Sequence, residues 1–155
     1  MNTVRTWQTI SINSNETLKL AEAVGHKLRG GETIELVSDL GGGKTTFVRG
    51  LAKGLGSKDT VSSPSFTLCN EYQADGLTLH HFDFYRLHEP GIMRDELAEL
   101  RGDPEAVMII EWADIVEDVL PSERLTIRFK TTDESSRQLT FEYPEKLAYL
   151  IQGKT

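Results

Sequence analysis

Apolar residues follow two different periods along the chain, and the change of period predicts where strands give way to helices. Residues 6–12 (TWQTISI) are rich in β-forming residues and predict a first strand. The Asn-Ser-Asn run at 13–15 offers helix N-cap chemistry, and apolar residues then recur at helical spacing to about Arg29. We therefore predict a helix that begins at 13–15 and ends before the pair Gly30 and Gly31.

The most informative stretch spans residues 33–48 (TIELVSDLGGGKTTFV). Ile34 and Leu36 alternate with polar residues, as in a strand, and a glycine-rich loop follows at 38–43. Apolar residues recur at helical spacing from about Lys44 until Gly56 ends the helix. This order of strand, glycine loop and helix is typical of a phosphate-binding P-loop.

The residue types of this loop suit a triphosphate. Consecutive glycines let the backbone amides curl around phosphate oxygens, and the helix that follows adds its free N–H groups and the positive end of its dipole. Lys44 can reach the outer phosphates, and the hydroxyl of Thr45 can bind magnesium. Ser38 stands where the G-x-x-x-x-G-K-[ST] pattern has its first glycine. The predicted nucleotide-binding residues are Asp39, Leu40, Gly41, Gly42, Gly43, Lys44, Thr45 and Thr46.

Each of two segments near this loop has two possible interpretations, one functional and one structural. The start of the first helix, at Ser14, lies near the nucleotide base if the P-loop prediction holds; otherwise the helix serves only for packing. The polar segment 57–65 either senses the γ-phosphate or is a plain surface loop. The other predicted elements are strands at 66–72 and 77–84 about a turn at 74–76, a short helix at 96–100, a buried strand at 107–110, a hairpin of 124–131 and 138–143, and a last short helix at 145–151.

Two acidic residues stand at the ends of apolar strands. Asp83 closes the strand at 77–84, and Glu111 directly follows the continuous apolar run 107–110, which indicates a central parallel strand. Ligands bind at the carboxyl edge of such sheets, so both acids are candidates for binding magnesium or orienting water. The alternatives are a turn residue at Asp83 and a solvent-facing carboxylate at Glu111. His80 and His81 are adjacent and point to opposite faces of a strand, which argues against a zinc site.

Composition limits the class of protein. A chain of 155 residues predicts one domain, 1–155, of α/β class: a P-loop NTPase-like fold with a mostly parallel central sheet, flanking helices and antiparallel hairpin strands. The single cysteine, Cys69, cannot form an internal disulfide and is expected to be a small buried strand residue. With no apolar run of membrane-spanning length, we predict a cytoplasmic protein. The net charge of -7 argues against primary binding of nucleic acid.

Four blocks of this sequence together resemble the TsaE (YjeE-type) family. They are the P-loop at 38–50, the segment Ser63-Pro64-Ser65-Phe66-Thr67-Leu68 with Asn70-Glu71-Tyr72, the run His81-Phe82-Asp83-Phe84-Tyr85-Arg86-Leu87, and Ile110-Glu111-Trp112. The resemblance implies an ATPase that supports formation of threonylcarbamoyladenosine in bacterial tRNA. It implies action with a threonylcarbamoyl transferase (TsaD-type) and its paralogue (TsaB-type), with tRNA reached through that complex.

The resemblance also implies roles for particular residues. Lys44 and Thr45 would bind phosphate and magnesium, and Glu111 would bind magnesium. Asp83 and Trp112 would support hydrolysis. The segment 63–67 would respond to nucleotide, and Arg137 would contact the nucleotide. The expected cofactors are therefore ATP and Mg²⁺.

Three other functions are alternatives to a coupled ATPase. A small GTPase needs an Asn-Lys-x-Asp motif, which the sequence lacks, and a glycine where Arg86 stands, three residues after Asp83. A small-molecule kinase usually carries an arginine-rich lid, which the acidic stretch after Arg86 does not offer. A nucleotide-binding regulatory subunit without meaningful hydrolysis is the alternative from a different class, and ATP binding without phosphate release would favour it.

Overall fold

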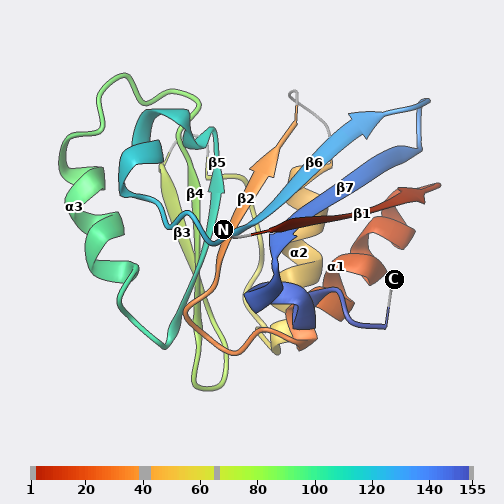
Figure 1. Cartoon of the computed structure of the whole chain (residues 1–155), viewed down its shortest axis with the longest axis horizontal. Helices are drawn as coiled ribbons and strands as arrows, with labels where there is room; N and C mark the ends of the chain where they lie inside the picture. Colours follow the sequence, from red (N-terminus) through yellow and green to blue (C-terminus); the bar gives the residue numbers. More distant parts are fainter. Residues whose placement is uncertain (1–2, 39–42, 65–66, 154–155) are drawn as a thin grey trace.

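The computed structural model describes residues 3–38, 43–64 and 67–153. Within them, seven strands form one sheet in the order β1-β7-β6-β2-β5-β4-β3 (Figure 1). The four middle strands β6, β2, β5 and β4 are parallel, and antiparallel pairs flank them on both sides. The strands are β1 (Val4–Ser11), β2 (Thr33–Val37), β3 (Cys69–Gln73), β4 (Thr78–Asp83), β5 (Ala106–Glu111), β6 (Leu125–Thr131) and β7 (Arg137–Pro144).

Helices cover the two faces of the sheet unequally. The face covered by α1 (Ser14–His26) and α2 (Lys44–Leu55) contains the larger apolar cluster, with Phe47 and Phe141 fully buried. A smaller cluster around Phe82 and Ile110 lies on the other face, under α3 (Gly91–Leu100) and the 3-10 helix η1 (Ala113–Val119) (Figure 1). A second 3-10 helix, η2 (Glu145–Leu150), follows β7.

Helices α1 and α2 pack side by side through glycines. A Cβ built on Gly25 would lie 2.3 Å from the Leu51 carbonyl oxygen, and one on Gly54 would lie 2.1 Å from the Glu22 carbonyl oxygen. Gly50 faces residues 18–22 of α1, while Gly54, one turn later, faces residues 22–26. The two helices therefore run parallel, and both N-termini lie at the same end of the molecule.

The α/β class, with a sheet that is mostly parallel in the middle and flanked by helices, is confirmed. Several boundaries were wrong. β1 begins at Val4 and ends at Ser11, and α1 ends at His26 rather than near Arg29, because the amides of Lys27 and Leu28 bond to carbonyls three residues back. α3 begins at Gly91, not at 96, and η1 was not predicted. The last helix, predicted at 145–151, is of 3-10 type.

The strand predicted at 66–72 begins only at Cys69. Leu68 has a φ of 66°, and its amide donates to the Pro64 carbonyl oxygen at 2.8 Å, so a turn precedes β3. Phe66 lies outside the described residues. Cys69 is a strand residue as expected, but it is only half-buried. In the described part of the chain, no helix has the length and apolar character needed to cross a membrane.

Candidate functional site

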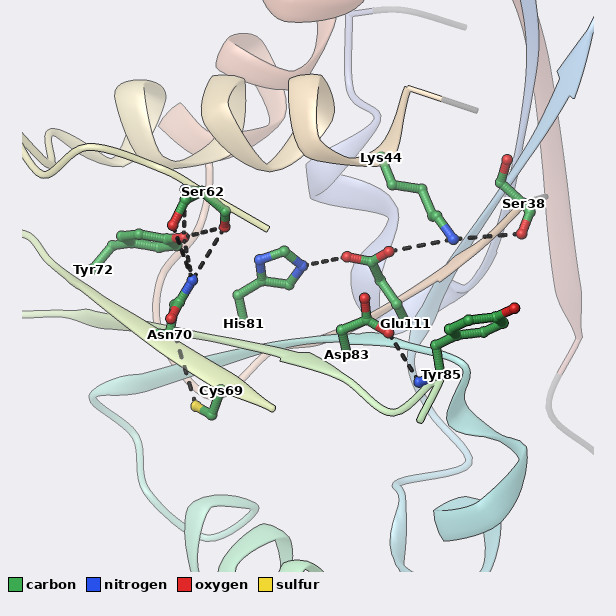
Figure 2. Close-up of polar contacts among 10 residues, drawn as sticks. All are labelled: Ser38, Lys44, Ser62, Cys69, Asn70, Tyr72, His81, Asp83, Tyr85 and Glu111. Carbon is green, nitrogen blue, oxygen red and sulfur yellow. Dashed lines mark hydrogen bonds and ion pairs between the residues drawn. The ribbon is translucent and has the colours of Figure 1, made fainter. Parts of the chain in front are cut away.

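Three parallel strands bring their carboxyl ends to one edge of the sheet. β4 ends at Asp83 and β5 ends at Glu111, and these two residues are register partners. β2 ends nearby at Val37, and the chain returns as α2, whose first residue is Lys44. Asp83, Glu111 and Lys44 have exposed fractions of only 6%, 4% and 7%. The strand-end acids and the first helical lysine therefore converge in a largely buried group (Figure 2).

Each oxygen of the Glu111 carboxylate has a cationic or N–H partner. Lys44 Nζ lies 3.3 Å from Oε1, and His81 Nε2 lies 2.5 Å from Oε2. Burial alone would raise the pKa of Glu111, but the hydrogen bond and charge of His81 and the charge of Lys44 outweigh it and lower the pKa below its ordinary value. The ionised carboxylate accepts hydrogen bonds only, so the imidazole N–H of His81 is the donor.

Lys44 lies at the first turn of α2, next to the positive end of the helix dipole. Its Nζ also donates to the Ser38 carbonyl oxygen at 3.4 Å and lies 5.2 Å from the centre of the Trp112 ring. Gly43, the N-cap, has a φ of 97°, a left-handed conformation that favours glycine. Thr45 and Thr46 follow in the same turn and are half-buried. The predicted ligands at 39–42 (Asp39, Leu40, Gly41 and Gly42) lie outside the described residues.

Asp83 lies beside an exposed aromatic pair formed by Tyr85 and Trp112. Asp83 Oδ1 accepts the backbone N–H of Tyr85 at 3.0 Å, which fixes the turn after β4. The Tyr85 and Trp112 rings are 4.9 Å apart at their centres, and the two residues are 47% and 37% exposed. Trp112 has a φ of 59°, a strained conformation of the kind that often marks functional sites. Its ring faces the ammonium of Lys44.

A small pocket adjoins this group. It has a volume of about 90 Å³ and is lined by Glu35, Leu36, Val37, Ser38, Lys44, Trp112, Ala113 and Asp114. A larger hollow of about 340 Å³ lies on the exposed face of β6 and β7. The arginines there, Arg124 and Arg128, already pair with glutamates of the sheet and of η1, so we do not assign the site to that hollow.

The other two predicted nucleotide contacts, Ser14 and Arg137, lie near each other. Ser14 is the first residue of α1, behind the N-cap Asn13, and Arg137 is the first residue of β7, in register with Ser11. Because α1 and α2 run parallel, Ser14 lies at the same end as Lys44. The guanidinium of Arg137 donates to the Ser136 carbonyl oxygen, while its buried Nε has no hydrogen-bond partner among the described residues.

Sequence reasoning missed two residues of the site. From the sequence, His81 has no role beyond the argument against a zinc site, yet His81 contacts Glu111. Tyr85 has no predicted role either, yet the Tyr85 ring contacts that of Trp112 at a tilt of 49°. The signal for His81 was available, because residues two apart on a strand share a face and His81 precedes Asp83 by two. Among the described residues, no group of three or more His, Cys, Asp or Glu side chains is arranged to hold a metal ion.

A parallel sheet whose carboxyl edge gathers a helix N-terminus, a lysine and two carboxylates is typical of α/β proteins that bind phosphorylated ligands. The family model described as "Threonylcarbamoyl adenosine biosynthesis protein TsaE" matches residues 11–139. The chain belongs to the TsaE family, and its role is therefore in the biosynthesis of threonylcarbamoyladenosine in tRNA.

Individual relatives agree with this assignment. The chain is 39% identical over 139 residues to the TsaE protein of Bacillus subtilis, covering 87% of this chain and 83% of that protein. It is 35% identical over 131 residues to the TsaE protein of Treponema pallidum, covering 84% and 96%. The crystal structure of Bacillus subtilis YdiB superposes with a TM-score of 0.73 at 33% identity, covering 98% of this chain and 94% of that one.

Proposed function

We propose that the protein binds ATP with magnesium at the edge formed by Lys44, Asp83 and Glu111 and hydrolyses it. In this proposal hydrolysis drives turnover of the complex that transfers the threonylcarbamoyl group to tRNA, in the cytoplasm. The observation that carries the proposal is the convergence of a buried lysine and two buried strand-end carboxylates at the N-terminus of α2. Such a group has no packing function that apolar residues would not serve better.

The oxygen donors at this edge fit a magnesium ion. Glu111 and Asp83 offer carboxylates on adjacent strands, and Thr45 offers a hydroxyl in the first turn of α2. These residues would hold the ion, which would supply positive charge against the negative charge that develops during phosphoryl transfer. One of the two carboxylates would bind the ion and the other would orient the attacking water.

Lys44 would exchange partners during binding. In the structure its ammonium holds Oε1 of Glu111 at 3.3 Å. A polyphosphate on the N-terminus of α2 carries more negative charge than one carboxylate and would draw the ammonium toward itself. The exchange would release Oε1 at the place where the metal ligand is needed. Lys44 thus keeps the carboxylate ionised and compensated until nucleotide arrives.

We further propose that hydrolysis is slow in the isolated chain and faster with the TsaD-type and TsaB-type partners. The exposed pair of Tyr85 and Trp112 beside Lys44 would be the surface that a partner covers. A partner that supplied a cation to the transferring phosphoryl group would raise the rate by about 10³–10⁵. Equal rates with and without partners would contradict this part of the proposal.

The experiment is phosphate release from ATP and from GTP with magnesium, with and without the partner pair. We expect release from ATP that rises with partners and disappears in Glu111→Ala and Lys44→Ala. Glu99→Ala, which removes an exposed carboxylate from α3, is the matched control and should behave as wild type. ATP binding without release in every mixture would favour the regulatory subunit, and normal turnover by Lys44→Ala would refute the site.

A further inference from the structure

His81 is the most deeply buried polar residue next to the site. Its exposed fraction is 0%, and its Nε2 donates to Glu111 Oε2 at 2.5 Å. Lys44 holds the other oxygen of that carboxylate. If nucleotide draws Lys44 away, as proposed above, the contact with His81 is the one that stays. His81 is therefore placed to keep the carboxylate oriented while the lysine changes partners.

The imidazole is not a good choice for packing alone. Its Nδ1 is buried and has no hydrogen-bond partner among the described residues, which is unfavourable for stability. Its neighbours on the same face of the sheet include Leu79 and Ile109, and an aliphatic residue would suit that environment. The contact of Nε2 with Glu111 is the feature of His81 that an aliphatic residue would not supply.

The opposite side of the ring faces the segment that precedes β3. Asn70 is the register partner of His81 across the β3–β4 pair, so the two side chains share a face and lie next to each other. Asn70 Nδ2 donates to the Ser62 carbonyl oxygen at 3.1 Å and to Ser62 Oγ at 3.3 Å. Its Oδ1 accepts from Thr67 Oγ1 at 3.0 Å. Asn70 therefore ties both described ends of the segment 62–67 to the strand beside His81.

Tyr72 strengthens the same attachment. Its hydroxyl donates to the Ser62 carbonyl oxygen at 2.9 Å and accepts the Ser62 backbone N–H at 3.1 Å. The ring is 3% exposed, so this end of the segment is held by a rigid, buried group. Figure 2 shows the His81 ring between this Ser62–Asn70–Tyr72 cluster and the Glu111 carboxylate.

We propose that His81 is a positioning residue that fixes the Glu111 carboxylate and, through its neighbour Asn70, couples that carboxylate to Ser62 and Thr67. The inference rests on the proposed magnesium–ATP site, since Glu111 is the residue it positions. His81 touches neither nucleotide nor metal. A shift of the carboxylate on metal binding would displace the ring against its register partner Asn70 and so reach Ser62 and Thr67, and a shift of those two residues would reach the carboxylate by the same route.

The test replaces His81 with two amide side chains, glutamine and asparagine, which differ only in length. In His81→Gln the amide nitrogen can take the place of Nε2 and donate to Glu111, whereas in His81→Asn it takes the place of Nδ1 and falls short. Both variants bury a neutral amide, so a purely structural role would affect them alike. The readouts are the dissociation constant of ATP with magnesium and with EDTA, and kcat and KM for hydrolysis.

We expect His81→Asn to lose about 10–100-fold of the magnesium-dependent gain in ATP affinity and of kcat, with ATP affinity in EDTA unchanged. His81→Gln should stay close to wild type in all these quantities. Equal values in both variants, whether both are impaired or both are normal, would overturn the positioning role. A wild-type protein that binds magnesium–ATP but releases no phosphate would contradict the proposed hydrolysis alone, because the affinity readout does not depend on turnover.

The coupling to the segment has its own readout. We expect magnesium–ATP to change the hydrogen exchange of the backbone amides of residues 60–63 in the wild type. The change should be absent in Asn70→Ala at saturating nucleotide. Gln73→Ala, at the far end of the same strand, is the control and should respond as wild type. An unaltered response in Asn70→Ala would overturn the coupling.

Discussion

The pairing of Lys44 with Glu111 leads to a prediction about both stability and binding. Each side chain is at most 7% exposed, and the charged atoms are 3.3 Å apart. At an effective dielectric constant of about 20, Coulomb attraction at this distance is about 5 kcal/mol. The loss of hydration of both groups offsets much of that attraction. We expect a net coupling free energy of about 1–3 kcal/mol, well above that of an exposed pair.

A double-mutant cycle measures this coupling. The variants are Lys44→Met, Glu111→Gln and the double variant, and the quantity is the free energy of unfolding from urea titrations at neutral pH. Met keeps the length of the lysine stem, and Gln keeps an acceptor for His81, so the cycle isolates the charge pair. The exposed pair of Lys53 and Glu22, at 3.8 Å, provides the control cycle and should couple by less than about 1 kcal/mol.

In the proposed site the same coupling would oppose nucleotide binding without metal, because phosphate would have to take the lysine from the carboxylate. Glu111→Gln should therefore bind ATP in EDTA more tightly than wild type does. A coupling of 1–3 kcal/mol corresponds to a factor of roughly 5–150 in affinity. Isothermal titration calorimetry checks it. A coupling below about 0.5 kcal/mol, or weaker binding by Glu111→Gln in EDTA, would refute the proposed exchange of partners.

Three further predictions concern pH and stability. The fold lowers the pKa of Glu111 below its ordinary value of 4.5. The ionised carboxylate therefore contributes to stability above pH 4.5, and this contribution is lost as the pH falls through the lowered pKa. The difference in unfolding free energy between wild type and Glu111→Gln should shrink over that pH range. Gly25→Ala should destabilise by about 1–3 kcal/mol in urea unfolding, because its Cβ would overlap the Leu51 carbonyl, whereas Gly102→Ala, with its nearest atom at 3.9 Å, should be nearly neutral. Asn13→Ala removes the N-cap of α1 and should lower the melting temperature by an amount equivalent to about 1 kcal/mol.

Local patterns predicted the central elements because each carries its own signal. The strand–loop–helix unit at 33–55 joins two periods across a glycine loop, and the apolar run before Glu111 is a continuous buried strand. The location of the site then follows from the strand direction, because the last residues of parallel strands lie at the same edge of the sheet. That is why Asp83 and Glu111 could each be named as a candidate before their register was known.

Elements that depend on tertiary contacts were not predictable in this way. η1 is short and interrupted by the non-helical backbone of Val116, and the predicted helix at 96–100 covers only the second half of α3 (Gly91–Leu100). The role of His81 depends on Glu111, which is 30 residues away in the sequence. The two residues meet only because their strands pair in the sheet. Single-sequence periodicity gives the face on which His81 lies but not its partner.

The glycine contacts between α1 and α2 have a genetic consequence. The first turn of α2 carries Lys44, and the rest of that helix is held against α1 with no room for a methyl group at Gly25, Gly50 or Gly54. Any larger residue there must move one helix away from the other, and the lysine moves with it. Mutations at these three glycines should therefore behave in a screen for activity as loss-of-function alleles, although every residue of the proposed nucleotide site is intact.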